Sequence, residues 1–505
     1  MTDSIATTPL GRLRGSEAAG AYAFKGIPYG ASTAGENRWM PPQPLEPWTG
    51  IRDALELGPS CPQPQRRPTG WAQEMSESED CLVLNVWTPH VGDDGAKRPV
   101  MVWLHGGGYS IGSGSWPIYD GAALAARGDV VVVTVNHRLG VLGYLYLADV
   151  PGCDIAAVNT GMLDLVASLE WVRENIACFG GDADNVTIFG ESGGGAKVSA
   201  LHVMPAAEGL FHRAVVQSGP GLRLQAPADA TAQSLQLLAS LGIEPGPRAF
   251  EALQSAAAGA LVKAANDLTG GAMGALHPVL DGITTTAHPS AAFALGTAFD
   301  VPLLIGRNKD EGTLMLASDP VLGDPDSLDE DGLRARLAPV LGERSAELLD
   351  HYRAVYAGAS NLDLLIALRT DSFMGIGTAR LAEQKLAGST RTPVYNYRFN
   401  WAAGPLRSAH GFEIPFVFGN VREPIMRPSP RRTLLAERMS EAWLAFARTG
   451  DPSHAGLPEW PPYSLEDRAT MIFDADECAV GPDPFEEVHD LWRIEGAQAP
   501  TEVVI

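Results

Sequence analysis

A serine flanked by glycines is the first candidate for chemistry in this sequence. Residues 190–194 read Gly-Glu-Ser-Gly-Gly, so Ser192 stands in the pattern Gly-x-Ser-x-Gly. That pattern places a serine on a sharp turn between a strand and a helix, where the strained backbone needs small neighbours. An apolar run at 186–189 precedes the serine and a helical pattern at 195–203 follows it. This context favours a nucleophilic serine over an ordinary glycine-rich turn.

A second glycine-rich segment follows another predicted strand. Residues 100–104 are apolar, and the tetrad His-Gly-Gly-Gly occupies positions 105–108. When a serine attacks a carbonyl carbon, negative charge develops on the oxygen, and backbone N–H groups stabilise it where no Cβ blocks the approach. We therefore expect the N–H groups of Gly107, Gly108 and Gly193 to form an oxyanion hole. A phosphate-binding loop is the poorer interpretation, because no Lys-Ser/Thr pair follows the glycines.

Charge and hydropathy exclude several function classes. The 505 residues contain 37 Lys and Arg and 60 Asp and Glu, which gives a formal net charge of −23. Such a surface repels phosphates and anionic lipids, so we expect neither nucleic acid nor a membrane as a partner. The longest apolar runs, such as 130–133, are too short to span a bilayer. We see no signal peptide and expect a cytoplasmic protein.

The cysteines point to the same compartment. Their number, five, is odd, which fits a reducing environment where thiols stay free. No Cys-x-x-Cys motif or Cys/His cluster offers a zinc site, and Cys153, Cys178 and Cys478 are interpreted as small apolar fillers. We expect no metal and no organic cofactor.

Strands and helices alternate along most of the chain. Residues 129–135 form a β-branched run typical of a strand buried on both faces, and residues 160–178 show helical spacing. Further strands are predicted at 186–189, 213–217 and 301–305. This alternation predicts an α/β fold with a mostly parallel central sheet and helices on both faces.

Two helical stretches interrupt the alternation, at about 225–299 and about 327–388. Neither shows a series of strands, and no flexible linker flanks either one. We therefore expect a single domain over residues 1–505, in which the two stretches are insertions around one active-site gorge. Separate domains are the weaker alternative.

Five groups of segments resemble the type-B carboxylesterase family, which includes para-nitrobenzyl esterases, carbamate-hydrolysing esterases and cholinesterases. These segments span nearly the whole chain. They are 24–29 (FKGIPY), 79–82 (EDCL) with 84–87 (LNVW), 179–182 (FGGD) through Ser192, 308–312 (NKDEG), and 410–413 (HGFE) with 416–419 (FVFG). The resemblance implies the α/β-hydrolase fold.

The resemblance also implies a catalytic triad of Ser192, Glu311 and His410. Independent logic agrees: a serine hydroxyl needs an imidazole to take its proton, and the imidazole needs a carboxylate on its other nitrogen. The chain order Ser, Glu, His is the order expected for this fold. Asp310 is the rival acid. Neighbouring side chains generally point in different directions, so only one of the two should reach His410, and the resemblance favours Glu311.

Supporting residues are implied as well. They comprise two residues beneath the triad, two ion pairs and one pair of cysteines: Glu191 and Ser218; Arg38 with Glu79 and Arg138 with Asp182; Cys61 with Cys81. The family bridges the matching cysteines. Here we expect two sulfurs close enough to bridge but kept reduced by a cytoplasmic host. Trp71, in the loop between them, is interpreted as a packed surface residue rather than a substrate contact.

Three positions depart from the family pattern. Gly193 stands where Ala is usual, Leu165 where Gln usually follows Asp164, and His137 where Tyr usually precedes Arg138. None of these residues belongs to the triad, so the departures bear on specificity more than on activity.

The sequence therefore predicts a serine carboxylesterase that hydrolyses a neutral, hydrophobic carboxylic ester through an acyl-enzyme intermediate. Two alternatives stay open: a carbamate or amide hydrolase with the same triad, and a non-catalytic cholinesterase-like binding protein. The presence of all three triad residues speaks against the second. A small-molecule ester is the expected partner, and the sequence carries no signal for the natural ester or the oligomeric state.

Overall fold

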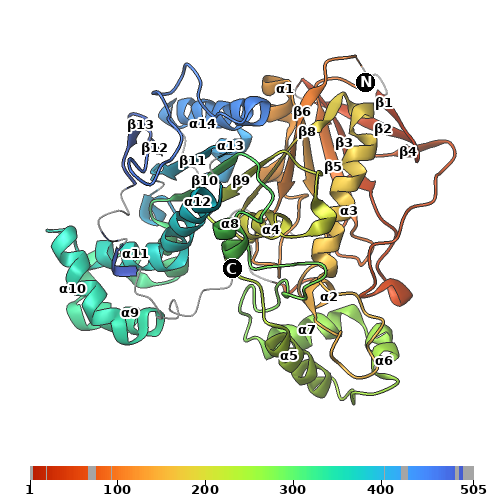
Figure 1. Ribbon diagram of the computed structural model, residues 1–505, viewed down its shortest axis with the longest axis horizontal. Coiled ribbons are helices and arrows are strands. Elements are labelled where there is room, and N and C mark those ends of the chain that lie inside the picture. Colours follow the sequence, from red (N-terminus) through yellow and green to blue (C-terminus); the bar gives the residue numbers. More distant parts are fainter. Residues whose placement is uncertain are drawn as a thin grey trace.

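The computed structural model describes residues 4–492 except 19, 66–74, 93, 390, 403, 422–429, 484–487 and 489. Within these residues one large sheet runs through the molecule in the order β1-β2-β3-β5-β7-β6-β8-β9-β10-β11-β12-β13, with β4 beside β2 (Figure 1). Its strands are β1 (Ser4–Thr8), β2 (Gly11–Ala18), β3 (Ala21–Pro28), β4 (Ile51–Asp53), β5 (Val83–Thr88), β6 (Arg98–Leu104), β7 (Val131–Val135), β8 (Gly181–Glu191), β9 (Arg213–Gln217), β10 (Leu303–Asn308), β11 (Val394–Phe399), β12 (Thr470–Phe473) and β13 (Ala479–Gly481).

The centre of this sheet is parallel and its edges are antiparallel. Each neighbouring pair from β7 through β12 is parallel. The pairs β1–β2, β2–β3, β3–β5, β5–β7 and β12–β13 are antiparallel, and β4 pairs with β2 in the parallel direction. The prediction of a mostly parallel sheet is therefore confirmed. In such a sheet the carboxyl ends of the parallel strands meet at one edge, where ligands of open α/β sheets usually bind.

Helices cover both faces of the sheet, as the sequence predicts. Along β6, Val100, Val102 and Leu104 belong to one apolar core, and Met101 and Trp103 belong to the other. This alternation follows from the two-residue period of a strand. The first core includes α3 (Thr160–Asn175), α4 (Gly193–Leu201), α8 (Pro289–Leu295) and α12 (Ile376–Gly388); the second includes α1 (Ala122–Gly128), α13 (Ile414–Phe418) and α14 (Pro430–Thr449).

The two predicted helical insertions are present. The first lies between β9 and β10 and the second between β10 and β11, and neither contains a strand within the described residues. Their remaining helices are α5 (Pro227–Ser240), α6 (Ala249–Ser255) and α7 (Ala258–Leu268), then α9 (Glu330–Leu341), α10 (Ser345–Val355) and α11 (Asn361–Thr370). In Figure 1, α5–α7 lie below the sheet and α9–α11 lie to its lower left, while α8 and α12 pack together.

The helices of the second insertion share an apolar core of their own, which includes Leu333, Leu348 and Leu365. The interpretation of the whole chain as one domain stays a prediction. None of the helices in the described part of the chain combines the length and the apolar character that crossing a membrane requires.

Candidate active site

Ser192 occupies a strained turn between a strand and a helix. β8 ends at the residue before it and α4 begins at the residue after it. Its φ of 57° and ψ of −127° lie in a region that residues with a side chain rarely adopt. The turn is held in place by its own N–H, which donates to Gln217 O at 2.9 Å. A Cβ on Gly194 would lie 2.0 Å from Leu104 O, so α4 can begin this close to β6 only because position 194 is glycine.

The predicted oxyanion loop lies directly against this turn. It follows β6, and Gly107 and Gly108 have φ values of 94° and 56°. Within the described residues, neither of their N–H groups donates to a backbone acceptor. Gly193 is the first residue of α4, so its N–H precedes the helical hydrogen bonds. A Cβ on Gly193 would lie 2.6 Å from Gly108 N. The structure thus brings the three predicted donors together.

Glu311 and His410 form the second half of the site. His410 Nδ1 lies 2.6 Å from Glu311 Oε2, and the carboxylate is fully buried at the start of a short 3₁₀ helix, η5 (Glu311–Leu316), just after β10. Its other oxygen, Oε1, accepts hydrogen bonds from Ser218 Oγ and Asn308 N, both at 2.6 Å. Three contacts therefore fix the orientation of the carboxylate, and through it the imidazole.

The neighbouring carboxylate takes a different direction. Asp310 Oδ2 accepts a long hydrogen bond from Ser408 N at 3.4 Å, and Asp310 Oδ1 lies 3.8 Å from Arg407 Nη1. No contact joins Asp310 to His410 within the described residues. Of the two adjacent acids, only Glu311 reaches the imidazole.

A further acid lies on the other side of the imidazole. Glu191 Oε1 is 3.2 Å from His410 Nε2, the nitrogen that would take the serine proton. The pair lacks hydrogen-bond geometry, and Nε2 has no hydrogen-bond partner in the described part of the chain, Ser192 Oγ included. Catalytic hydrogen bonds are often long in enzymes without substrate and tighten in the complex.

Glu413 completes a cluster of buried carboxylates around His410. It accepts hydrogen bonds from Gln217 Nε2 at 3.1 Å and Asn308 Nδ2 at 2.7 Å. Sequence reasoning assigned it no role, although it is the glutamate of the His-Gly-Phe-Glu motif.

This cluster controls protonation at the site. Burial lowers the pKa of His410, but Glu191 and Glu311 raise it by more, so its pKa is raised overall. Burial raises the pKa of Glu191 to about 8 and that of Glu413 to about 7. Buried carboxylates this close together cannot all be ionised at neutral pH. The cluster therefore keeps a proton available beside Ser192.

The sequence model of the carboxylesterase family matches residues 2–492. The chain belongs to the carboxylesterase family. It is 38% identical to the para-nitrobenzyl esterase of Bacillus subtilis over 501 residues, which cover 96% of this chain and 98% of that protein. It is 33% identical to the phenmedipham hydrolase of Pseudarthrobacter oxydans, with 98% of each chain covered.

A solved structure agrees. The carboxylesterase EST55 of Geobacillus stearothermophilus matches with a TM-score of 0.85 and 41% identity, over 97% of this chain and 100% of that one. The predicted α/β-hydrolase fold and the predicted family are confirmed. As a family member the chain is a serine hydrolase that acts on carboxylic esters. The similarities favour neither a carbamate or amide hydrolase nor a non-catalytic binding protein.

Of the two ion pairs implied by the family resemblance, one is present in the structure and the other is not. Arg38 and Glu79 form a two-pronged pair at 2.7 and 2.6 Å, as predicted. The pair of Arg138 with Asp182 is wrong: Arg138 binds Asp164 on α3 instead, through Nε at 2.8 Å and Nη2 at 2.6 Å. Arg138 follows the carboxyl end of β7, whereas Asp182 lies near the amino end of β8. The parallel strands place the two residues at opposite edges of the sheet.

Cys61 and Cys81 contact each other inside this carboxylesterase. Both are buried free thiols, and the hydrogen bond with Cys61, together with burial, raises the pKa of Cys81 well above its usual value. The contact agrees with the expectation that the two sulfurs are neighbours, and their reduced state stays a prediction. Trp71 lies outside the described residues.

Proposed function

We propose that this carboxylesterase hydrolyses neutral, hydrophobic carboxylic esters with Ser192 as nucleophile, His410 as general base and acid, and Glu311 as the acid that orients His410. The observation that carries the proposal is the 2.6 Å contact of His410 with Glu311, at the same sheet edge as the strained Ser192 turn. Ser218 and Glu191 support the triad, since Ser218 holds Glu311 and Glu191 lies beside Nε2.

In the first step Ser192 Oγ bonds to the ester carbonyl carbon while His410 Nε2 takes the hydroxyl proton. The carbonyl oxygen becomes negative and accepts hydrogen bonds from the N–H groups of Gly107, Gly108 and Gly193. The carbon–oxygen bond to the alcohol then breaks, and the imidazolium gives its proton to the departing alcohol. Glu311 stabilises the imidazolium throughout.

In the second step water replaces the alcohol and the same groups act again. His410 takes a proton from water, the resulting hydroxide attacks the acyl carbon, and Ser192 leaves with the proton returned to its oxygen. Every step uses residues of this chain alone.

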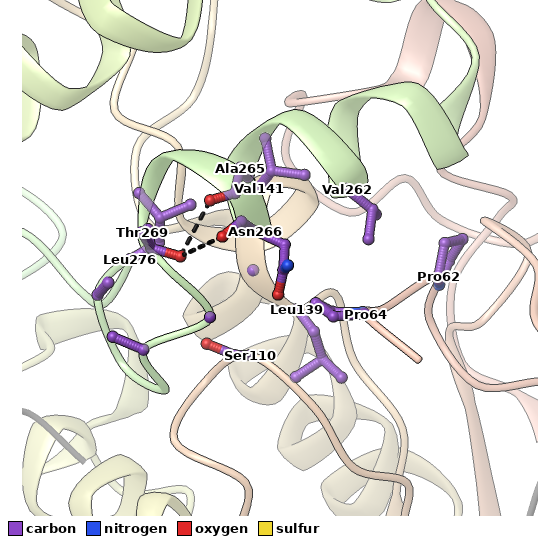
Figure 2. A pocket seen from close by; sticks show the side chains of 14 residues that line it. Pro62, Pro64, Ser110, Leu139, Val141, Val262, Ala265, Asn266, Thr269 and Leu276 are labelled. Atoms are coloured by element: carbon purple, nitrogen blue, oxygen red, sulfur yellow. Dashed lines mark hydrogen bonds between the residues drawn. The ribbon is translucent and has the colours of Figure 1, made fainter. Parts of the chain in front are cut away.

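An apolar pocket beside the oxyanion loop supports the preference for neutral, hydrophobic substrates. In Figure 2, Val262 and Asn266 of α7 point toward the segments that carry Leu139 and Pro64. Ser110 also lines this pocket, and its hydroxyl donates to Gly108 O at 3.2 Å. The described lining contains no ionisable side chain: Pro62, Pro64, Ser110, Leu139, Gly140, Val141, Val262, Ala265, Asn266, Thr269, Gly271, Ala272, Ala275 and Leu276.

The proposal extends to a small-molecule ester as partner and to a cytoplasmic location. The odd number of cysteines, five, supports that compartment. Cell fractionation with an activity assay tests it, and activity confined to the extracellular fraction would contradict it.

Ser192→Ala tests the chemistry. We expect kcat/KM for p-nitrophenyl esters to fall by about 10⁴-fold or more, because the nucleophile is lost while the fold is kept. Covalent labelling by an organophosphate should disappear as well. Ser199→Ala, a buried change in the same helix, is the matched control and should retain activity and labelling. Near-normal turnover by Ser192→Ala would refute the proposal. Matched p-nitrophenyl carbamates should turn over more slowly than the esters.

A further inference from the structure

Lys197 is a buried cation that the proposed mechanism does not use. It lies one helical turn after Gly193 on α4 and is completely buried. Its Nζ donates to His105 O at 2.9 Å, and no carboxylate pairs with it within the described residues. An unpaired ammonium in the interior is costly, so a protein keeps one only where it serves a purpose or the site tolerates its neutral form.

The ammonium contacts both ends of the oxyanion loop. His105, whose carbonyl it binds, is the first residue of the loop, and Tyr109 directly follows Gly108. The ammonium lies 5.4 Å from the centre of the Tyr109 ring, within the range of a cation–π contact. Lys197 therefore contacts the residues on both sides of the segment that carries the Gly107 and Gly108 N–H groups.

The other titratable groups around Lys197 are neutral. The rings of His105 and His137 stand edge to face at 4.8 Å, and both are fully buried. Burial and the charge of Lys197 lower the pKa of each histidine well below its usual value. Burial raises the pKa of Tyr109, so its hydroxyl stays protonated. Lys197 is thus the source of positive charge in this cluster.

We propose that Lys197 is a positioning residue of the oxyanion hole. Its hydrogen bond to His105 O fixes the loop, and its positive charge lies between the residues that flank the N–H donors of Gly107 and Gly108. Negative charge is greater on the substrate oxygen in the transition state than in the bound ester, so the residue acts on kcat more than on KM. This inference rests on the proposed function, because it requires an oxyanion formed by attack of Ser192.

The protonation state of the lysine gives the inference a second consequence. Burial lowers the pKa of Lys197 to about 7. Above that pH the amine is neutral, and the electrostatic part of its effect is lost. The wild-type enzyme should therefore show a fall in kcat on the alkaline side that a variant without the amine lacks.

The decisive variant is Lys197→Met, which keeps the length of the side chain but removes its charge and its donor. We expect kcat to fall by about 10²-fold, the usual cost of losing one oxyanion donor, with KM changed by less than about threefold. Binding of a trifluoromethyl ketone, whose adduct with Ser192 carries an oxyanion, should weaken by a similar factor. Because removing a buried charge relieves a desolvation cost, the variant should melt no lower than the wild type.

Two further variants separate charge from hydrogen bonding. Lys197→Arg should restore part of kcat, whereas Lys197→Gln should keep a donor without the charge and lack the alkaline fall. Ser199→Ala, in the same helix, should behave like the wild type. A Lys197→Met enzyme with wild-type kcat, pH profile and ketone affinity would overturn the inference and leave the proposed function intact. Turnover by Ser192→Ala would instead overturn the function itself.

Discussion

At the scale of single residues, this site is organised by carboxylates that compete for one imidazole. Glu311 binds Nδ1 of His410, and Glu191 lies next to Nε2. In the proposed mechanism the two acids act on different nitrogens of the imidazole and at different moments. Glu311 stabilises the imidazolium that forms when Ser192 loses its proton, whereas Glu191 favours an imidazolium before substrate has arrived.

The identity of the triad acid can be tested by a pair of amide substitutions. Glu311→Gln should lower the rate of acylation by about 10²- to 10⁴-fold, because the imidazolium loses its buried counter-charge. Asp310→Asn should cost less than about tenfold, since Asp310 contacts Ser408 and Arg407 rather than His410. Stopped-flow measurement of p-nitrophenol release gives both rates. The reverse order of effects would show that the acid is misassigned.

Glu191 should set the acidic limb of the pH profile. Burial raises the pKa of Glu191, but where this carboxylate is ionised its charge beside Nε2 raises the pKa of His410, and the base form of the imidazole is the active one. Removing the charge in Glu191→Gln lowers that pKa, so the acidic limb of kcat/KM should move to lower pH by about one unit. Glu170→Gln, an exposed substitution on α3, should leave the limb in place. A shift to higher pH would contradict the electrostatic account.

The proposed roles of the motif residues were predictable from the sequence. Which other side chains are buried, and where those side chains point, was not. Ser192, Glu311 and His410 stand in motifs whose chemistry can be argued from residue type and order. Lys197 stands in a glycine- and alanine-rich helical segment. Its role depends on a side chain that turns inward to His105 O, and one sequence does not specify that direction.

At the scale of elements, the pattern of apolar residues located strands and helices correctly but misplaced the ends of some strands. The strand expected at 186–189 runs from Gly181 to Glu191: Gly181 pairs with Arg98 of β6, and after a register shift the pairing resumes between Val186 and Val100. The strand expected at 301–305 is β10, which continues through Arg307 and Asn308. These polar residues are buried by the second insertion and by the segment that follows β11, so local hydropathy could not reveal them.

The helix α7 should determine how large a substrate the enzyme accepts. Val262 of α7 lines the apolar pocket beside the oxyanion loop. Val262→Trp would fill this space, so kcat/KM should fall by about tenfold for p-nitrophenyl octanoate and little for p-nitrophenyl acetate. Ala260→Trp, at an exposed position of the same helix, is the matched control. Equal losses for both esters would show that the pocket does not hold the substrate chain.

At the scale of the whole molecule, repulsion among the excess negative charges lowers the stability of the folded protein. The net charge of −23 disfavours the compact state, and salt screens that repulsion. Raising NaCl from about 10 to about 150 mM at pH 7 should therefore raise the Tm by about 2 °C, which corresponds to roughly 2 kcal/mol for a chain of this length. Calorimetry at two pH values checks this expectation. Near the isoelectric point of about 4.8 the effect should vanish, and a lower Tm in salt at pH 7 would contradict it.

The order in which strands, insertions and site residues follow one another along the chain also has a consequence for how the protein can change in evolution. Ser192, Glu311 and His410 follow β8, β10 and β11, while both helical insertions begin and end at neighbouring parallel strands. An insertion can therefore lengthen, shorten or be exchanged with that of a relative while the sheet keeps the three proposed catalytic positions in register. Selection can act on the lining of the substrate pocket, such as α7, separately from the bond-breaking chemistry. Such an arrangement allows a family to change what it recognises while it keeps its chemistry.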